Sequence, residues 1–173
     1  MASKRASFEG ALEALGVTVT STTESELETA VTEAITEPAV GVTLDETVGA
    51  EAFSLTETSV TVDPTPVALR EATTGVTGAE LGVGDYGSLV LSMTDQASEL
   101  VSLFVERHVA ILHEDDIQPD MDAAVAELDD RFNETGGSAI IATGPSATAD
   151  MGALVKGAHG PKEVHVIVVE EGA

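Results

Sequence analysis

Apolar residues in the first part of the chain recur at helical spacing in two places. Those of residues 8–15 fall at i, i+4 and i+7, which predicts an amphipathic helix that ends at Gly16. The same spacing within residues 27–35, behind a polar start at 22–28, predicts a second helix that Pro38 ends. After it we expect short strands at 39–44 and 60–63, a helix at roughly 46–55 and another from Pro64 to about Thr73.

The second half of the chain alternates between apolar runs and helical patterns. The apolar residues of 120–132 share one face of a predicted helix, and a small helical segment is expected after the turn at Gly144-Pro145. Nearly continuous apolar strands separated by helices are typical of a parallel sheet covered on both faces. We therefore predict an α/β fold in one domain, residues 1–173, whose Rossmann-like, mostly parallel sheet is flanked by helices. The predicted strands of this half are 89–93, 103–112, 138–143 and 163–169.

The charge balance is strongly acidic and narrows the possible partners. Seven Lys and Arg residues stand against 31 Asp and Glu, a net charge of −24, which disfavours nucleic acid and anionic membrane surfaces as partners. The chain is nevertheless 43% hydrophobic with a mean hydropathy of +0.16, so it can build a core.

Carboxylates replace lysines on the predicted surface, since Lys occurs only at 4, 156 and 162 while small core residues and threonines abound. This pattern indicates a halophilic protein, because concentrated salt screens the mutual repulsion of carboxylates. We expect its melting temperature to rise by several degrees between about 0.1 M and about 3 M KCl. A melting temperature that stays constant over that range would contradict the halophilic interpretation.

The chain contains no cysteine, which excludes disulfides, thiolate nucleophiles and Cys-ligated zinc or iron–sulfur clusters within it. Its first residues lack an apolar signal stretch, and its apolar runs are far shorter than the roughly 18 residues that suggest a membrane span. We therefore expect a cytoplasmic protein, in a cytoplasm of high salt concentration.

Five glycines occur within residues 75–88, a density that in a strand context marks tight turns, bulges or close approach of the backbone to something. A hairpin with unusual turns and a ligand-contacting loop are both compatible with this pattern. If the segment contacts a ligand, the candidate binding residues are Gly75, Thr77, Gly78, Glu80, Asp85 and Gly87.

A second candidate site is the run of small and hydroxyl residues that follows the predicted strand 138–143. Ligands of open α/β sheets collect at the carboxyl ends of strands, and free N–H groups that open a helix suit a carboxylate or phosphate. The alternative is a simple helix cap made by Ser146 or Thr148. The candidate ligand-binding residues here are Thr143, Gly144, Pro145, Ser146, Thr148 and, further on, Gly160.

Asp150 and His159 are the candidates for proton transfer, because a carboxylate and an imidazole could form an acid–base pair across the strand end. A histidine beside Gly160-Pro161 is also compatible with a plain turn residue. We predict no metal site: the acidic run 114–116 after His113 is explained as a helix start. His165, inside an apolar strand, is interpreted as a core histidine with one hydrogen bond.

Two of these segments together carry a family resemblance. Ala-Thr-Gly-Pro-Ser-Ala-Thr-Ala-Asp at 142–150 and Gly-Ala-His-Gly-Pro-Lys-Glu-Val-His-Val at 157–166 resemble the C-terminal signature of the lactate-utilisation (LUD) domain family. Gly-Val-Thr-Gly-Ala-Glu at 75–80 and Asp-Tyr-Gly-Ser at 85–88 look like its glycine-rich segment, and Ser102-Leu103 with His108-Val109 resembles its intervening strand. The resemblance covers roughly residues 70–170, and residues 1–69 form the helical N-terminal part of the same domain.

The resemblance implies a fold similar to the phosphosugar isomerases and CoA transferases, a Rossmann-like parallel sheet with a small antiparallel excursion. It also implies a role in oxidising L-lactate to pyruvate beside two companion proteins, at least one of which carries iron–sulfur clusters. This chain would then bind no cofactor itself, and the clusters would lie on the partner subunits. The chain departs from the family pattern at 85–88, at 150–152 and at Ala147, where the family usually has Arg, which leaves Lys156 or Lys162 as nearby cations.

Two functional hypotheses follow. In the first, the protein is an accessory, non-redox subunit of an L-lactate utilisation system with iron–sulfur partners. In the second, it is a stand-alone enzyme or ligand-binding regulator of the isomerase and CoA-transferase type, acting on a small organic acid or phosphate ester. Cysteine-rich partners would favour the first hypothesis, and a protein found alone would favour the second.

Overall fold

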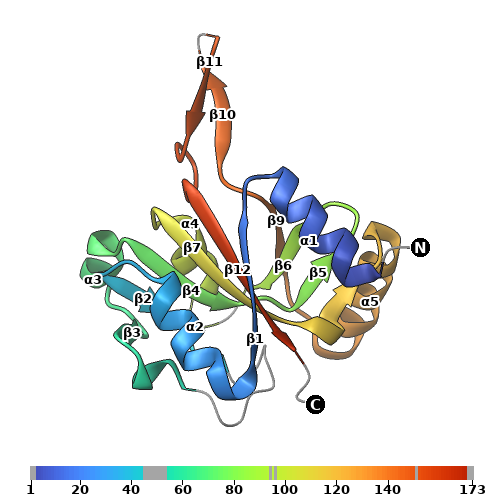
Figure 1. Ribbon diagram of the computed structural model, residues 1–173, viewed down its shortest axis with the longest axis horizontal. Coiled ribbons are helices and arrows are strands. Elements are labelled where there is room, and N and C mark those ends of the chain that lie inside the picture. Colours follow the sequence, from blue (N-terminus) through green and yellow to red (C-terminus); the bar gives the residue numbers. More distant parts are fainter. Residues whose placement is uncertain (1–2, 45–53, 94, 96, 151, 171–173) are drawn as a thin grey trace.

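A computed structural model describes residues 3–44, 54–93, 95, 97–150 and 152–170. Within them the backbone forms a six-stranded sheet, a four-stranded sheet and a two-stranded hairpin (Figure 1). The six-stranded sheet is parallel throughout, in the order β1 (Thr18–Thr23), β12 (Glu163–Glu170), β7 (Arg107–His113), β4 (Thr74–Gly78), β2 (Ala39–Gly41) and β3 (Val60–Val62). The four-stranded sheet has the order β8 (Ile117–Gln118), β5 (Leu81–Val83), β6 (Ser88–Ser92) and β9 (Ala139–Thr143), with only β5 and β8 parallel.

The helices begin and end close to the residues that the apolar spacing predicted. Side-chain oxygens of Ser3, Thr65 and Asp120 each accept a hydrogen bond from the backbone N–H three residues later, which caps the first, third and fifth helices. Predicted helices at 8–16, 27–35, 64–73 and 120–132 are thus confirmed. The described residues form five α-helices: α1 (Lys4–Ala14), α2 (Leu27–Ala34), α3 (Pro66–Glu71), α4 (Ser98–Leu103) and α5 (Met121–Thr135).

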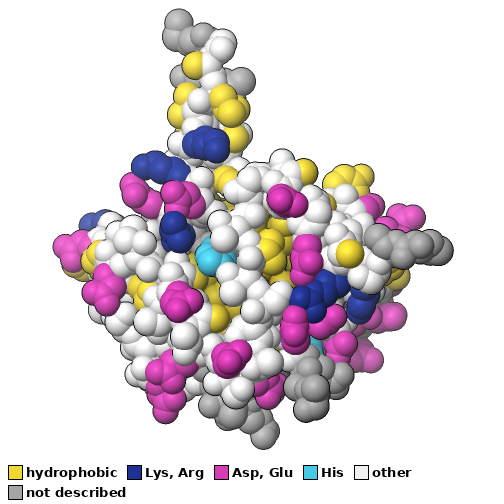
Figure 2. All heavy atoms as spheres, in the orientation of Figure 1, with side chains coloured by type: hydrophobic (Ala, Val, Ile, Leu, Met, Phe, Trp, Pro, Cys, Tyr) yellow, Lys and Arg dark blue, Asp and Glu magenta, His cyan; other side chains and the backbone are white. Residues whose placement is uncertain are grey.

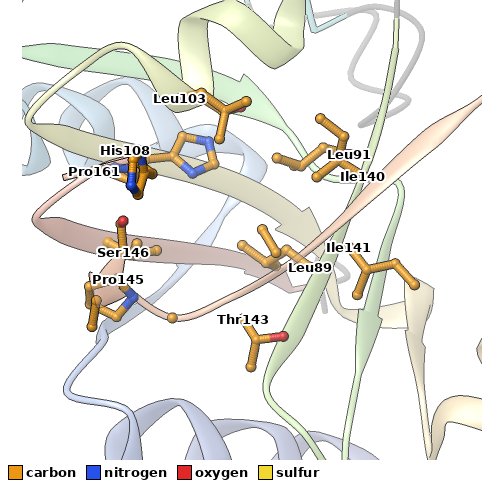
Figure 3. A pocket seen from close by; sticks show the side chains of 17 residues that line it. Leu89, Leu91, Leu103, His108, Ile140, Ile141, Thr143, Pro145, Ser146 and Pro161 are labelled. Carbon is orange, nitrogen blue, oxygen red and sulfur yellow. The ribbon is translucent and has the colours of Figure 1, made fainter. Parts of the chain in front are cut away.

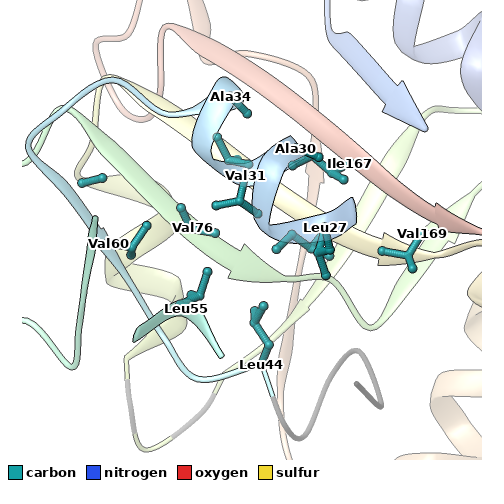
Figure 4. Packing of buried hydrophobic residues seen from close by; sticks show 13 residues of the cluster. Leu27, Ala30, Val31, Ala34, Leu44, Leu55, Val60, Val76, Ile167 and Val169 are labelled. Carbon is teal, nitrogen blue, oxygen red and sulfur yellow. The ribbon is translucent and has the colours of Figure 1, made fainter. Parts of the chain in front are cut away.

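Both faces of the six-stranded sheet are covered. On one face, Leu27 and Val31 of α2 pack in a cluster with sheet residues such as Val76 (Figure 4). On the other face, Val101 of α4 packs against Val40 of β2. The residue before Val40, Ala39, points to the opposite face and packs with α2. This alternation is the expected result of strands buried on both sides, and it confirms the α/β fold with a mostly parallel central sheet.

The four-stranded sheet joins the larger one through a second cluster. Phe8 and Leu12 of α1 pack there with Leu112 and Val168 of the parallel sheet and with Leu89 of β6. The helix α5 covers the outer face of the smaller sheet through its own apolar stripe. The residues of that contact are Leu81, Val83, Val90, Ala124 and Leu128.

Several local expectations were wrong. The polar helix start expected at 22–28 is wrong at its first two residues, because they belong to strand β1, whose backbone pairs with the apolar strand β12. The predicted strand 103–112 starts only at Arg107, after α4, and the predicted strand 138–143 lies in an antiparallel ladder with β6. The predicted helix 46–55 lies almost entirely outside the described residues, and Leu55–Glu57 is a 3₁₀ turn.

The small helix expected after Gly144-Pro145 is also wrong. Here the chain forms strands β10 (Ala147–Asp150) and β11 (Ala153–Lys156), which pair as a hairpin and project from the body (Figure 1). We call this hairpin the arm. Its strand β11 is exposed along its whole length, so this strand gains no support from a core. No helix in the described part of the chain is long and apolar enough to cross a membrane.

Candidate functional site

A cavity of about 340 Å³ lies where the two sheets, α4 and the base of the arm meet, and we call it the intersheet pocket. Figure 3 shows its two different sides: leucines and isoleucines of β6 and β9 face a side that holds His108, Ser146 and Pro161. Among the described residues that line it, none is Lys, Arg, Asp or Glu. The pocket therefore suits a small ligand with an apolar part and a few hydrogen-bonding groups.

His108 sets the polar character of one wall. It lies in β7, fully buried, and its Nε2 is 2.8 Å from the Oγ1 of Thr77 on the neighbouring strand β4. Burial lowers the pKa of His108 to about 4, since no opposite charge offsets the loss of water. The ring is therefore neutral at pH 7, and it can donate or accept a hydrogen bond but brings no charge to the pocket.

Backbone hydrogen bonds connect Ser146, which lines the pocket, to the segment that follows the arm. Its backbone N–H donates to the carbonyl of Pro161 at 2.8 Å, and its carbonyl accepts from the N–H of Gly157 at 2.9 Å. Its hydroxyl points toward the His108 side of the pocket (Figure 3). A Cβ on Gly160 would lie 3.1 Å from that of Ser146, so the two segments pack closely here. The arm base is thereby held to the pocket by backbone bonds.

The structure gathers many of the predicted ligand residues of the second half around this pocket. Pro145, Ser146 and Gly144 line it beside Thr143, whose hydroxyl is 2.7 Å from that of Ser88. His159 and Gly160 line it from the other side. We predicted an anion site here because a helix start would offer free N–H groups. The segment forms strand β10 instead of a helix.

Thr148 and Asp150 lie instead along the arm. Asp150 pairs with Ala153 at the far end of the hairpin, three residues beyond Ala147 at its base, which is about 10 Å of strand. His159 is exposed and follows the base of the arm. The register of the hairpin thus does not bring Asp150 to His159.

Close packing explains why two positions of the glycine-rich segment are glycines. A Cβ on Gly75 would lie 2.2 Å from the backbone oxygen of Val101, so this glycine lets α4 approach β4. Gly87, with φ of +63°, lets the β5–β6 turn approach the backbone of α1. Gly78 is buried at the end of β4, and Asp85 is exposed in the turn.

Glu80 belongs to a polar network away from the intersheet pocket. Its carboxylate accepts hydrogen bonds from Ser92 and, at 3.0 Å, from Arg131 of α5, which also pairs with Glu127 at 2.9 Å. Within the predicted glycine-rich set, Thr77 contacts the pocket residue His108 through its side chain, and Gly75 is the register partner of His108 on the neighbouring strand. The roles of the other glycine-rich residues in binding stay predictions.

His165 makes the single hydrogen bond expected of it, with Nε2 2.8 Å from the Oγ1 of Thr20, and is half-buried. His113 accepts a bond from the backbone N–H of Asp115 at the start of a 3₁₀ turn. In the described ranges, no group of three or more His, Asp or Glu side chains is placed to hold a metal ion.

Sequence reasoning missed the pocket role of His108 and of the apolar wall. His108 entered only as part of the family resemblance, although an isolated histidine in an apolar strand is a signal that could have marked it. Leu89, Leu91 and Ile140 carry no such signal, because their pattern is that of any core strand.

Comparisons with known proteins agree with this geometry. The profile of the LUD domain matches residues 5–169. Lactate utilization protein C of Bacillus licheniformis is 34% identical over 108 residues, 59% of this chain and 44% of that protein, so the chain matches less than half of that relative's length. A crystal structure of a DUF162 family protein from Deinococcus radiodurans has the same fold, with a TM-score of 0.71 at 20% identity over 98% of this chain and 99% of that one. The chain belongs to the LUD domain family.

Proposed function

We propose that this protein is an accessory, non-redox component of an L-lactate utilisation system. The observation that carries the proposal is the match of the LUD domain to nearly the whole chain, together with a relative named lactate utilization protein C. The system would oxidise lactate to pyruvate through iron–sulfur partner proteins, in a cytoplasm of high salt concentration. The acidic surface of the chain is compatible with that setting.

The residues of this chain do not fit an iron–sulfur cluster. The sequence has no cysteine to supply thiolates, and the described side chains offer no alternative group of three metal ligands. Electron transfer would therefore use groups held by partner subunits. This division of labour leaves binding and assembly to the present chain.

The intersheet pocket is the part of the chain best suited to such a binding role. We propose that Thr143, Gly144, Pro145, Ser146 and Gly160 contact a small ligand there, because they and the neutral His108 surround one cavity. His159 also lines this cavity, and we propose it for proton transfer to or from that ligand.

The experiment is a tagged pull-down from a halophilic host, kept in KCl of about 1 M or more so that weak charge contacts are screened. We expect a brown complex whose visible absorption indicates iron–sulfur clusters, and cysteine-rich partners identified by mass spectrometry. An equally acidic cytoplasmic protein with the same tag is the control, because a net charge of −24 can itself capture basic proteins. A colourless protein recovered alone would contradict the proposal and favour the stand-alone alternative.

A further inference from the structure

One group of positive charges lies at the base of the arm on this acidic molecule. Three of the seven Lys and Arg residues, Arg107, Lys156 and Lys162, line a cavity of about 280 Å³ that we call the basic cavity. Dark-blue side chains gather at the base of the projecting arm in Figure 2. The basic cavity lies beside the intersheet pocket, with which it shares Pro145 and Val164.

The three cations come from different elements, so only the fold brings them together. Arg107 is the first residue of β7, Lys156 is the last residue of β11, and Lys162 directly precedes β12. The other polar residues of the lining are Thr18 and His165, which are register partners on β1 and β12, and Glu163, whose carboxylate pairs with Arg107. The basic cavity is thus formed between the amino ends of three parallel strands and the base of the arm.

The ion pairs leave an excess of positive charge. Arg107 donates to Glu163 at 2.6 Å and to the carbonyl of Ala34 at 3.1 Å, while Lys162 pairs with Glu106 at 2.8 Å. Lys156 has no ion pair within the described part of the chain. The paired cations keep further N–H donors available, and Lys156 contributes an uncompensated charge.

His165 adds a neutral polar group beside these charges. Its ring is half-buried, and burial together with the neighbouring Arg107 guanidinium lowers its pKa, which keeps it uncharged at neutral pH. The positive charge of the basic cavity therefore rests on its Arg and Lys side chains, which outnumber the one carboxylate among the described lining residues, Glu163.

We propose that the basic cavity is a binding site for a small oxyanion, a carboxylate or a phosphate, held by Lys156, Lys162 and Arg107. Its volume is at the low end for ligand sites, which suits an anion of a few heavy atoms rather than a nucleotide. Lys and Arg are the donors that form strong, charge-assisted hydrogen bonds to such oxygens. The negative net charge of the protein does not prevent anion binding at high salt concentration. The screening length is only about 3 Å at 1 M salt, so the affinity depends on the groups in direct contact with the anion.

This inference goes beyond the proposed function and does not depend on it. Isothermal titration calorimetry of the full chain, in about 1 M KCl, would use inorganic phosphate, acetate and L-lactate as separate probes. Saturable binding of acetate or L-lactate alone would identify a carboxylate site, and binding of phosphate alone would identify a phosphate site. No saturable binding of any probe up to about 50 mM would overturn the proposal.

Two lysine variants locate the binding. Lys156→Gln is expected to weaken the affinity about tenfold, the loss of one charge-assisted contact, and a further Lys162→Gln change to weaken it again. Lys4→Gln is the matched control, because it removes the same charge from an exposed lysine that lies outside the basic cavity and binds the carbonyl of Asp115. Its affinity should stay within about twofold of the wild type.

Circular dichroism melts establish that all three variants are folded. An affinity that Lys156→Gln and the double variant leave unchanged, or that Lys4→Gln weakens equally, would overturn the assignment. Such a result would concern the basic cavity only, because the pull-down of iron–sulfur partners has a different readout.

Discussion

Gly75→Ala is expected to lower the free energy of unfolding by about 3 kcal/mol, the upper part of the usual range for overpacking a core. Gly75 lies in the central strand β4, between Val40 of β2 and His108 of β7. A Cβ built on it would lie 2.2 Å from the backbone oxygen of Val101 in α4. Because that atom belongs to the backbone, no side-chain rotation relieves the contact, and α4 must move away from the sheet.

Thermal unfolding followed by circular dichroism measures this effect. For a chain of this size the expected loss corresponds to a decrease in melting temperature of roughly 10 °C. Gly10→Ala is the matched control, since Gly10 lies inside α1 with no atom within 4 Å of the added Cβ. Alanine should stabilise that helix by about 0.5–1 kcal/mol. Equal melting temperatures for Gly75→Ala and the wild type would show that α4 does not press on β4 as described.

We expect the buried ring of His108 to lower the free energy of unfolding by about 3 kcal/mol when the pH falls from 7 to about 4. The folded protein holds its ring neutral, with a pKa of about 4, whereas the ring in the unfolded chain has the ordinary histidine pKa of 6.5. The unfolded state therefore binds a proton first as the pH falls below 6.5. The stabilisation is complete above that pH and is lost as the pH falls toward the folded pKa.

Urea unfolding of the wild type and of His108→Gln, at pH 7 and at about pH 4.5, tests the prediction. The variant should be less stable at pH 7, by about 1 kcal/mol for a weakened contact with Thr77, but its stability should depend less on pH. Titration of the carboxylates is common to both proteins and cancels in the comparison. His159→Gln is the control, because His159 is exposed. Parallel stability curves for wild type and His108→Gln would show that the buried ring does not titrate as proposed.

The helices and the apolar strands were predictable from the sequence for a local reason. The spacing of Phe8 and Leu12 in α1, or of Leu27 and Val31 in α2, reports which face of each helix is buried. The continuous apolar run in β12 likewise reports burial on two sides, which is the condition of a central parallel strand. The motifs that indicated the family are also local, so they could be read without knowledge of the fold.

The elements that were missed obtain their structure from partners. Strand β1 is rich in threonine and resembles a polar approach to a helix until its pairing with β12 is known. Strand β11 of the arm has no buried face to impose a period on its sequence, and the segment after Pro145 was assigned to a small helix. Gly75 was open to interpretation as a ligand contact, and only the position of Val101 explains its missing side chain.

The sequence by itself determined the class of fold, the acidic surface, the lack of thiolate ligands and the segments that resemble the LUD domain, because each depends on composition or short-range pattern. The tertiary structure alone decided which residues meet. It placed His108 beside Ser146 at one pocket, separated Asp150 from His159, and brought Arg107, Lys156 and Lys162 to one cavity. Such contacts join residues far apart in the chain, and their distances depend on strand order and hairpin register, which local pattern does not encode.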